Sequence, residues 1–372
     1  MTILGTRPEI IRLSQVMALV DQYMNQVIVH TGQNYDYELN EIFFKDLNVR
    51  KPDYFLGVDC SSLGKAYGNI IIEVEKVLVK EKPDAVLILG DTNSSIGGII
   101  AKRMKIPIYH MEAGNRCFDF NVPEEINRRI IDHISDFNLV YTEHARRNLL
   151  AEGIHPRQIY LTGSPMKEVL VANLDKIKAS KIINKLKLKP KQYMLVSMHR
   201  EENIDLKKNL LSLLTALNKL AKEYKMPIIV STHPRTRKQL EKIKGIKIDP
   251  KIKFLKPFGF LDYVHLQMNA FCVISDSGTI SEESSILSFP AVTIRNTTER
   301  PESIDSGNII LTGLDPATIN NSVDLVTSEW NNTKQHKIPF EYEIDNVSHR
   351  VVKLITGTAK LSHLWENIVT ND

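Results

Sequence analysis

HMEAGNRCFDFNVPEEINRRIIDH occupies residues 110–133, and the rest of the chain is organised around this stretch. It overlaps KIPIYH, a short segment whose β-branched residues predict a buried strand. Glu112 is therefore expected just past the carboxyl end of a strand, where α/β proteins bind ligands. Pro123 and the acidic residues after it predict a helix that begins near Glu124. Glu124 and Arg128 then share one helix face, either within a site or as an ordinary solvated ion pair.

Short apolar segments alternate with amphipathic helices along the chain. In the first half, the predicted strands include MTIL, QVIVHTG, DAVLILGD and FNLVYT, and residues 64–80 have helical spacing. A lysine-rich stretch, 175–189, predicts solvated helical surface. The pattern then restarts with YMLVSMH and continues through PIIVSTH, FCVISDSG and AVTIRN. Such alternation is typical of parallel, doubly wound sheets, so we predict an α/β protein with two Rossmann-like domains.

The domain boundary is expected near Gly163–Pro165. An N-terminal domain would then span residues 1–165 and a C-terminal domain residues 166–345, because 372 residues exceed the usual size of one hydrophobic core. A last helix is predicted at about residues 346–368. We expect this helix, and with it the segment 346–372, to pack back on the N-terminal domain.

The composition narrows the class of protein. With 42% hydrophobic and 25% charged residues, it is ordinary for a soluble globular protein. A net charge of +4 without a basic block argues against a nucleic-acid partner, whereas a few placed arginines suit a small polyanion. The three cysteines are far apart and predict neither a disulfide framework nor a CxxC metal site. Without a signal-peptide core or an apolar run of roughly 18 residues, we expect a cytoplasmic protein with no membrane partner.

Two turns carry signals for phosphate binding. GTRPE, residues 5–9, places Arg7 between a predicted strand and a helix, where it could bind phosphate oxygens or be a solvated turn residue. SDSGTISEE, residues 275–283, places Ser277 and Gly278 in the same kind of turn. Glycine there allows a phosphate to approach the backbone, and a nearby glutamate can accept from ribose hydroxyls. The alternative for this second turn is a plain helix cap with acids in the first helical turn.

Further polar residues follow predicted strands, while several familiar motifs are absent. His199 and His233 come after adjacent strands and together suggest a polar cleft, and Arg300 lies in the loop RNTTERPE, 295–302. The sequence contains neither GxGxxG nor GxxxxGK[ST], which argues against a tightly bound nicotinamide cofactor and against P-loop ATP hydrolysis. It also lacks HExxH and Asp-rich loops, so no metal is expected.

Six motifs appear in a fixed order: GTRPE at 5–9, GDTNS at 90–94, HMEAG at 110–114, PEEINR at 123–128, SDSG with a following EE at 275–283, and TTERPE at 297–302. Together they closely resemble the non-hydrolysing UDP-N-acetylglucosamine 2-epimerases over essentially the whole chain. The resemblance implies a glycosyltransferase B-type fold, with two Rossmann-like domains facing across a cleft, in a homodimer. It also implies a UDP-sugar ligand and no cofactor.

The resemblance implies elimination of UDP across C1 and C2, then re-addition through a 2-acetamidoglycal with inversion at C2. Asp91, Glu112 and Glu124 would be the acid–base candidates, oriented by Arg128, and which of them removes the proton stays open. Arg7 and His199 would stabilise the departing UDP. The other UDP-sugar ligands implied are Arg12 and Tyr263, Ser277 and Gly278 for phosphate, Glu283 for ribose and Arg300 for the sugar–phosphate side, with uracil near Phe258–Tyr263.

Departures from the family pattern bear on regulation and on the sugar. Arg12 replaces the usual lysine, which keeps the charge and changes its geometry. In the turn GQNYD, Gln33 is kept, but Asp36 and Asn69 replace a glutamine and an arginine of the family's allosteric site. We therefore predict that activation by substrate is lost. The segments GQNYDYELN and EAGNRCFD, the second of which contains Asn115, Cys117 and Phe118, together resemble the branch of the family that acts on 6-deoxy sugars.

That branch converts UDP-2-acetamido-2,6-dideoxy-L-talose to UDP-N-acetyl-L-fucosamine for capsule or O-antigen synthesis, and we favour this assignment. The first alternative is a UDP-N-acetylglucosamine/UDP-N-acetylmannosamine 2-epimerase. A more distant one is a glycosyltransferase on the same fold, which would need an acceptor groove. A non-catalytic nucleotide-sugar sensor would not require Asp91, Glu112 and Glu124 together.

Overall fold

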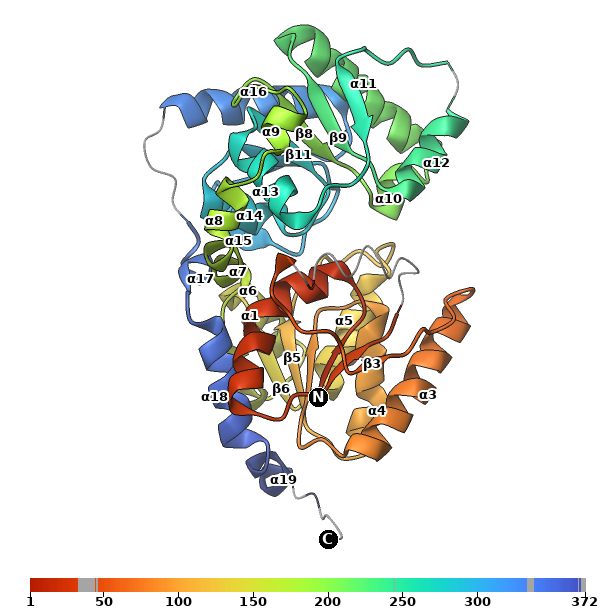
Figure 1. The fold of residues 1–372 in the computed structure, drawn as a ribbon, viewed down its shortest axis with the longest axis vertical. Helices are drawn as coiled ribbons and strands as arrows, with labels where there is room; N and C mark the ends of the chain where they lie inside the picture. Colours follow the sequence, from red (N-terminus) through yellow and green to blue (C-terminus); the bar gives the residue numbers. More distant parts are fainter. Residues whose placement is uncertain (33–43, 45, 244, 333–337, 367, 369–372) are drawn as a thin grey trace. The chain divides into compact units, whose positions relative to one another are not determined.

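The computed structural model divides the chain into two compact units (Figure 1). It describes residues 1–32, 44, 46–243, 245–332, 338–366 and 368. Unit 1 consists of Met1–Ala172 with Ile344–Asp372, and unit 2 of Asn173–Glu343. Gln33 and Asp36, which entered the prediction about regulation, lie outside the described residues. In the part of the chain that is described, no helix has both the length and the apolar character needed to cross a membrane.

Unit 1 is built on a parallel sheet, seven-stranded in the described residues, with strand order β3-β2-β1-β4-β5-β6-β7. Its strands are β1 Thr2–Leu4, β2 Ile28–His30, β3 Tyr54–Phe55, β4 Val86–Leu89, β5 Ile108–Ala113, β6 Phe137–Val140 and β7 Ile159–Leu161. Strands β4 and β5 are neighbours, with Ile88 opposite His110 and Leu89 opposite Met111. The turns after these two strands therefore emerge side by side at the same edge of the sheet.

Helices cover this sheet on both faces, as a parallel sheet requires. They are α1 Arg7–Tyr23, α3 Leu63–Glu81, α4 Gly97–Arg103, α5 Glu124–Ile134, α6 Glu143–Ala151, α7 Met166–Ala172, α18 Val347–Thr358 and α19 Leu361–Trp365, with 3₁₀ turns η1 Asn93–Ile96 and η2 Pro156–Gln158. Ser62 and Thr142 begin α3 and α6 by accepting from the amides of Lys65 and Ala145. Apolar side chains such as Ile88 fill the space between sheet and helices.

The C-terminal segment belongs to unit 1. Helix α18, blue in Figure 1, packs on α1, and Thr358 forms a 2.7 Å hydrogen bond with the hydroxyl of Tyr109 on β5. The single helix predicted over 346–368 is wrong, because it divides into α18 and α19 after the weak helix formers Gly357 and Thr358. Helix α7 packs on α1, so unit 1 runs a few residues past the predicted boundary at 165.

Unit 2 has its own parallel sheet, six-stranded in the described residues, with order β10-β9-β8-β11-β12-β13. The strands are β8 Met194–Ser197, β9 Ile228–Ser231, β10 Ile252–Leu255, β11 Cys272–Ser275, β12 Ala291–Thr293 and β13 Ile310–Leu311. The helices are α8 Leu174–Lys178, α9 Ile182–Lys185, α10 Glu201–Ile204, α11 Lys207–Tyr224, α12 Pro234–Lys242, α13 Phe260–Asn269, α14 Ile280–Leu287, α15 Pro301–Asp305, α16 Pro316–Asn332 and α17 Phe340–Glu343. Hydrophobic clusters fill both faces of the sheet.

The prediction that residues 175–189 form solvated helical surface is wrong in part. The stretch forms two short helices, α8 and α9, and its lysines are exposed. Most of its large apolar residues are buried, however, and Ile182, Ile183 and Leu188 join the core beside Tyr193. The lysines dominated the composition of the stretch, whereas the few apolar side chains decide which face packs.

Candidate functional site

Asp91 and Glu112 lie at the ends of two neighbouring strands of unit 1. Asp91 follows β4 through Gly90, whose φ is +74°. Glu112 is the second-to-last residue of β5. The pairing with β6 shifts register between Met111 and Ala113, and Glu112 has a φ of +67°. A left-handed backbone is costly for a glutamate, and such strain clusters at functional sites. The bulge turns the Glu112 side chain toward the β4 turn.

The carboxylate of Glu112 is buried and paired. It forms an ion pair with Arg12 of α1 and accepts a 3.4 Å contact from Asn115 Nδ2. Its Oε2 lies 3.1 Å from the place where a Cβ on Gly90 would stand. The predicted residues Arg12 and Glu112, which are 100 residues apart in the chain, are thus brought together at the β4–β5 edge.

Asp91 is held by the predicted residue Arg128. Arg128 Nη2 lies 2.6 Å and Nε 2.9 Å from Asp91 Oδ2, and Nη1 also donates to Glu125 Oε2 at 3.1 Å. Glu125 is fully buried and also pairs with Arg129 at 3.0 Å. Asp91 itself keeps 20% of its side chain exposed, so it remains accessible to a ligand.

Glu124 and Arg7 are half-buried residues at the start of two helices. Glu124 is the first residue of α5 and Arg7 the first of α1, next to Pro8. Strand β1, which leads to Arg7, pairs with β4, so Arg7 and Asp91 emerge from adjacent strands. Glu124 and Glu125 differ in burial: Glu125 is buried between two arginines, whereas Glu124 is partly exposed.

Sequence reasoning missed two buried residues that support these turns. Glu9 accepts from the amide of Gly5 at 3.1 Å and from Ser94 Oγ, and burial raises the pKa of Glu9 despite these bonds. Asn127 donates to the carbonyl of Asp91 at 2.9 Å. Both residues stand inside recognised motifs, TRPE and PEEINR, so the available signal was their position next to charged neighbours.

In unit 2, His199 and Asp276 meet at the ends of the neighbouring strands β8 and β11. His199 Nδ1 lies 2.9 Å from Asp276 Oδ1, and Asp276 also accepts from the amides of His199 and Arg200 at 2.9 and 3.0 Å and from Asn203 Nδ2 at 3.1 Å. Burial opposes the charge of Asp276, but His199 and these donors lower its pKa to about 2. Burial likewise opposes the charge of His199, yet the carboxylate of Asp276 outweighs it and raises the pKa of His199. The imidazole stays 45% exposed, which limits the effect of burial and leaves it accessible to a ligand.

The turn after β11 brings together three predicted ligands. Ser277 Oγ lies 3.0 Å from Thr279 Oγ1, which donates to Glu283 at 2.8 Å, and Gln267 Nε2 donates to Glu283 at 2.6 Å. Burial raises the pKa of Glu283. A Cβ on Gly278 would stand only 2.6 Å from Glu299 Oε1, so a larger residue there would displace this carboxylate.

The remaining predicted residues lie around this turn or farther away. Arg300 is buried and donates to Glu282 at 2.8 Å. Tyr263 lies on α13, where burial raises the pKa of its hydroxyl and Glu283 adds to the effect. His233 instead caps α12 by accepting from the amide of Arg235 at 3.3 Å, which is a structural role. The segment expected near uracil, 258–263, contains the start of α13.

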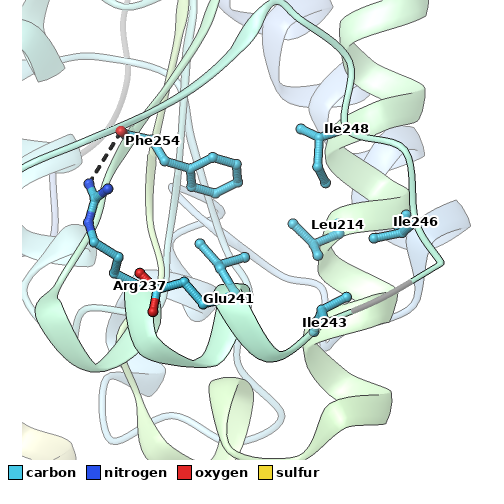
Figure 2. A pocket seen from close by; sticks show the side chains of 8 residues that line it. Leu214, Arg237, Glu241, Ile243, Ile246, Ile248 and Phe254 are labelled. Carbon is cyan, nitrogen blue, oxygen red and sulfur yellow. Dashed lines mark hydrogen bonds between the residues drawn. The ribbon is translucent and has the colours of Figure 1, made fainter.

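A pocket of about 310 Å³ lies elsewhere in unit 2, among α11, α12 and β10, and Figure 2 shows the side chains that line it. Its wall is mostly apolar, with Arg237 donating to the carbonyl of Phe254 at 3.4 Å. None of the predicted site residues lines it; the lining residues are Leu214, Arg237, Leu240, Glu241, Ile243, Ile246, Ile248 and Phe254. We therefore do not place the active site there. Among the described residues, no group of three or more His, Cys, Asp or Glu side chains could hold a metal ion.

Two Rossmann-like parallel units, one with paired carboxylates and one with a glycine turn at its strand ends, define a nucleotide-sugar enzyme of the glycosyltransferase B type. The chain belongs to the UDP-N-acetylglucosamine 2-epimerase family, whose sequence profile matches residues 18–356. It is thus an isomerase of the non-hydrolysing type. The family and fold predicted from the motifs are confirmed.

Solved structures and relatives agree with this assignment. A UDP-N-acetylglucosamine 2-epimerase from Rickettsia bellii is 51% identical, covers 97% of each chain and has a TM-score of 0.92. The Methanocaldococcus jannaschii enzyme, solved with UDP-GlcNAc and UDP, is 37% identical, with a TM-score of 0.88 and coverage of 96% of this chain and 99% of the other. A UDP-N-acetylglucosamine 2-epimerase from Methanococcus maripaludis is 42% identical over 89% of this chain and 93% of its own. A Pseudomonas aeruginosa relative named UDP-2,3-diacetamido-2,3-dideoxy-D-glucuronate 2-epimerase is 35% identical over 84% and 88%.

Proposed function

We propose that the protein interconverts C2 epimers of a UDP-2-acetamido sugar by eliminating and re-adding UDP. The observation that carries this proposal is the pairing of Asp91 with Arg128 and of Glu112 with Arg12 at the ends of adjacent strands. Two carboxylates held in fixed positions can serve as the base and the acid that an epimerisation needs. Glu124, at the start of α5, is the third candidate for this work.

The proposed reaction is balanced in protons. One carboxylate accepts the C2 proton, the C2–H electron pair forms the C1=C2 bond, and the C1–O bond to the diphosphate breaks. This gives UDP and a 2-acetamidoglycal. A diphosphate oxygen then returns to C1, and a second acid delivers a proton to the opposite face of C2.

Unit 2 would bind the UDP. The Ser277–Gly278 turn, between β11 and α14, would present backbone amides to a phosphate, and Glu283 would accept from ribose hydroxyls. His199, whose pKa is raised by Asp276, would carry positive charge toward the leaving diphosphate. Arg7 and Arg300 would add cationic groups on the sugar–phosphate side.

UDP-N-acetylglucosamine is the substrate that the names of the relatives support, and inversion at its C2 gives UDP-N-acetylmannosamine. The Pseudomonas relative has a different sugar in its name, so the sugar differs among relatives of this chain. A 6-deoxy sugar, the L-talose to L-fucosamine conversion, is the second candidate. It is favoured by two exposed aromatic rings in the loop after Glu112, Phe118 at 68% and Phe120 at 69% exposure, which would suit a methyl group at C6.

The decisive experiment follows C2 by NMR in D₂O, with UDP-N-acetylglucosamine and UDP-2-acetamido-2,6-dideoxy-L-talose as separate substrates. We expect deuterium at C2 of the product without added NAD, and scrambling of bridging ¹⁸O into non-bridging phosphate oxygens. Product that retains protium at C2, or a requirement for NAD, would exclude the mechanism. The ratio of kcat/KM values then decides the sugar, where a pocket of this kind discriminates by about 1–3 kcal/mol.

The resemblance further supports a cytoplasmic homodimer that serves capsule or O-antigen synthesis. Light scattering on the purified protein tests the homodimer, since a monomer at working concentration would contradict it. Loss of the surface polysaccharide on deletion of the gene tests the pathway.

A further inference from the structure

A buried cluster of charged side chains lies next to the turns that carry Asp91 and Glu112. It consists of His110 on β5, Asp132 on α5, Arg116 in the loop between them and Glu152 after α6. The side chains of His110, Asp132 and Arg116 are fully buried. Arg116 donates to Asp132 Oδ2 at 2.6 Å and reaches Glu152 with Nε at 2.8 Å and Nη2 at 2.6 Å. Burying several charges is costly even when they are paired and hydrogen-bonded, and apolar residues of similar volume often serve stability as well. The presence of this cluster therefore calls for an explanation.

This cluster contacts the backbone on both sides of the candidate carboxylates. His110 Nε2 donates to the carbonyl of Gly90 at 2.9 Å, directly before Asp91, and its Nδ1 lies 2.9 Å from Asp132 Oδ1. The two oxygens of Asp132 also accept from the amide of Gly114 at 3.1 and 3.2 Å, two residues after Glu112. One carboxylate therefore ties the turn after β4 to the bulge of β5.

The backbone at Gly114, just after β5, is closely packed and has little conformational freedom. Gly114 has a φ of +78°, and a Cβ there would stand 2.4 Å from the carbonyl oxygen of Ala145. Asp132 also lies four residues after Arg128 on α5, so the two side chains lie near one helix face. Arg128 holds the side chain of Asp91, while Asp132 holds the backbone amide of Gly114, two residues after Glu112. Helix α5 thus acts on both carboxylates at once.

We infer that Asp132 is a positioning residue that, through His110 and Gly114, fixes the separation of Asp91 from Glu112. This inference rests on the proposed function, in which those carboxylates act on opposite faces of C2. Burial would raise the pKa of Asp132, but His110 and Arg116 outweigh it and lower the pKa, so the residue acts as a carboxylate. A misplacement of about 1 Å can cost about 10²-fold in rate, so a residue that touches no substrate still affects turnover.

Asp136, between α5 and β6, provides a matched control that contacts β5 at its other end. Its Oδ2 accepts from the amide of Ile108 at 2.8 Å and its Oδ1 from Lys102 Nζ at 2.7 Å. It is 6% exposed, against 1% for Asp132. Both aspartates therefore accept from a backbone amide and pair with a cationic side chain, but Asp132 does so just after β5 and Asp136 at the start of β5, away from the candidate carboxylates. Loss of either charge destabilises the fold, whereas only Asp132 is expected to affect the chemistry.

The test compares Asp132→Asn with Asp136→Asn in the full chain, using UDP-N-acetylglucosamine in D₂O. The readouts are kcat, KM, the melting temperature and the ratio of C2 deuterium in product to C2 deuterium in recovered substrate. We expect Asp132→Asn to lower kcat by about tenfold or more with KM changed less than about threefold, and to change the deuterium ratio. If the turn that carries one candidate carboxylate moves, proton transfer at one face of C2 changes more than at the other face. Partial unfolding instead reduces proton transfer at both faces equally.

We expect Asp136→Asn to lower the melting temperature and to leave the deuterium ratio of the folded enzyme at the wild-type value. Equal losses of kcat in the two variants with an unchanged ratio would overturn the inference. His110→Gln covers the case in which Asp132→Asn does not fold, since glutamine can still donate to Gly90 but loses the contact with Asp132. Its deuterium ratio should change too, and an unchanged ratio would count against the inference. Wild-type enzyme that takes up no deuterium at C2 would instead contradict the proposed function.

Discussion

The two units arrange their polar groups at the strand ends by different means. In unit 1, arginines from two helices hold the side chains of the candidate carboxylates, since Arg12 pairs with Glu112 and Arg128 with Asp91. The buried Asp132 supports these residues only indirectly, through the backbone beside them. In unit 2, a buried carboxylate holds backbone, since Asp276 accepts from two successive amides. We therefore expect turnover to depend on the charged side chains of unit 1, and UDP affinity to depend on the backbone shape of the unit 2 turn.

The largest effect is expected from removing charge in unit 1. Asp91→Asn and Glu112→Gln should each reduce kcat by at least about 10²-fold, the range of general acid–base groups. UDP affinity, measured by calorimetry, should stay near the wild-type value because unit 2 is assigned to the nucleotide. Near-native turnover in both variants would show that turnover does not depend on these two charges of unit 1.

Adding a methyl group to the unit 2 turn should produce the next largest effect. Gly278→Ala places a Cβ 2.6 Å from Glu299 Oε1, which is held at 7% exposure by a 2.6 Å ion pair with Arg295. We expect UDP affinity to fall by about tenfold, or 1.4 kcal/mol. Gly357→Ala on α18 is the control, because a Cβ there meets nothing within 4 Å. Unchanged UDP binding in Gly278→Ala would show that the turn does not hold the nucleotide.

A smaller effect concerns pH and the His199–Asp276 pair. The pKa of His199 is raised by Asp276, so the imidazolium persists above the ordinary titration range. Its contribution to stability is complete below about pH 6.5 and is lost as the pH rises through the folded-state pKa. Asp276→Asn should move the alkaline limb of the kcat profile to lower pH, because the carboxylate that raises the pKa of His199 is lost. If the limb does not move, His199 is not the titrating group.

The smallest effect is expected at Asn69 on α3. Its Nδ2 donates to the carbonyl of Lys65 at 2.8 Å on an exposed helix face, where the family's allosteric site would place an arginine. Initial-rate curves should be hyperbolic, and Asn69→Ala should change kcat by less than about twofold, as for ordinary surface substitutions. A sigmoidal curve that added UDP-N-acetylglucosamine makes hyperbolic would contradict the predicted loss of activation.

The sequence by itself determined the order of elements, because periodicity and capping are local. Helix α5 begins at Glu124, as predicted. Each motif recognised in the sequence also falls at a strand end or helix start, since turn residues mark those positions directly. The lysine-rich stretch 175–189 was misjudged because composition hides a few buried apolar residues.

Only the tertiary structure decided which charges meet. Arg12 reaches Glu112 across 100 residues, and His199 meets Asp276 across strands that are neighbours in space but not in sequence. The structure also separates buried Glu125 from half-buried Glu124, although both glutamates stand side by side in the first turn of one helix. Local patterns record backbone preference and burial, whereas the pairing of a charge depends on which distant group shares its low-dielectric surroundings.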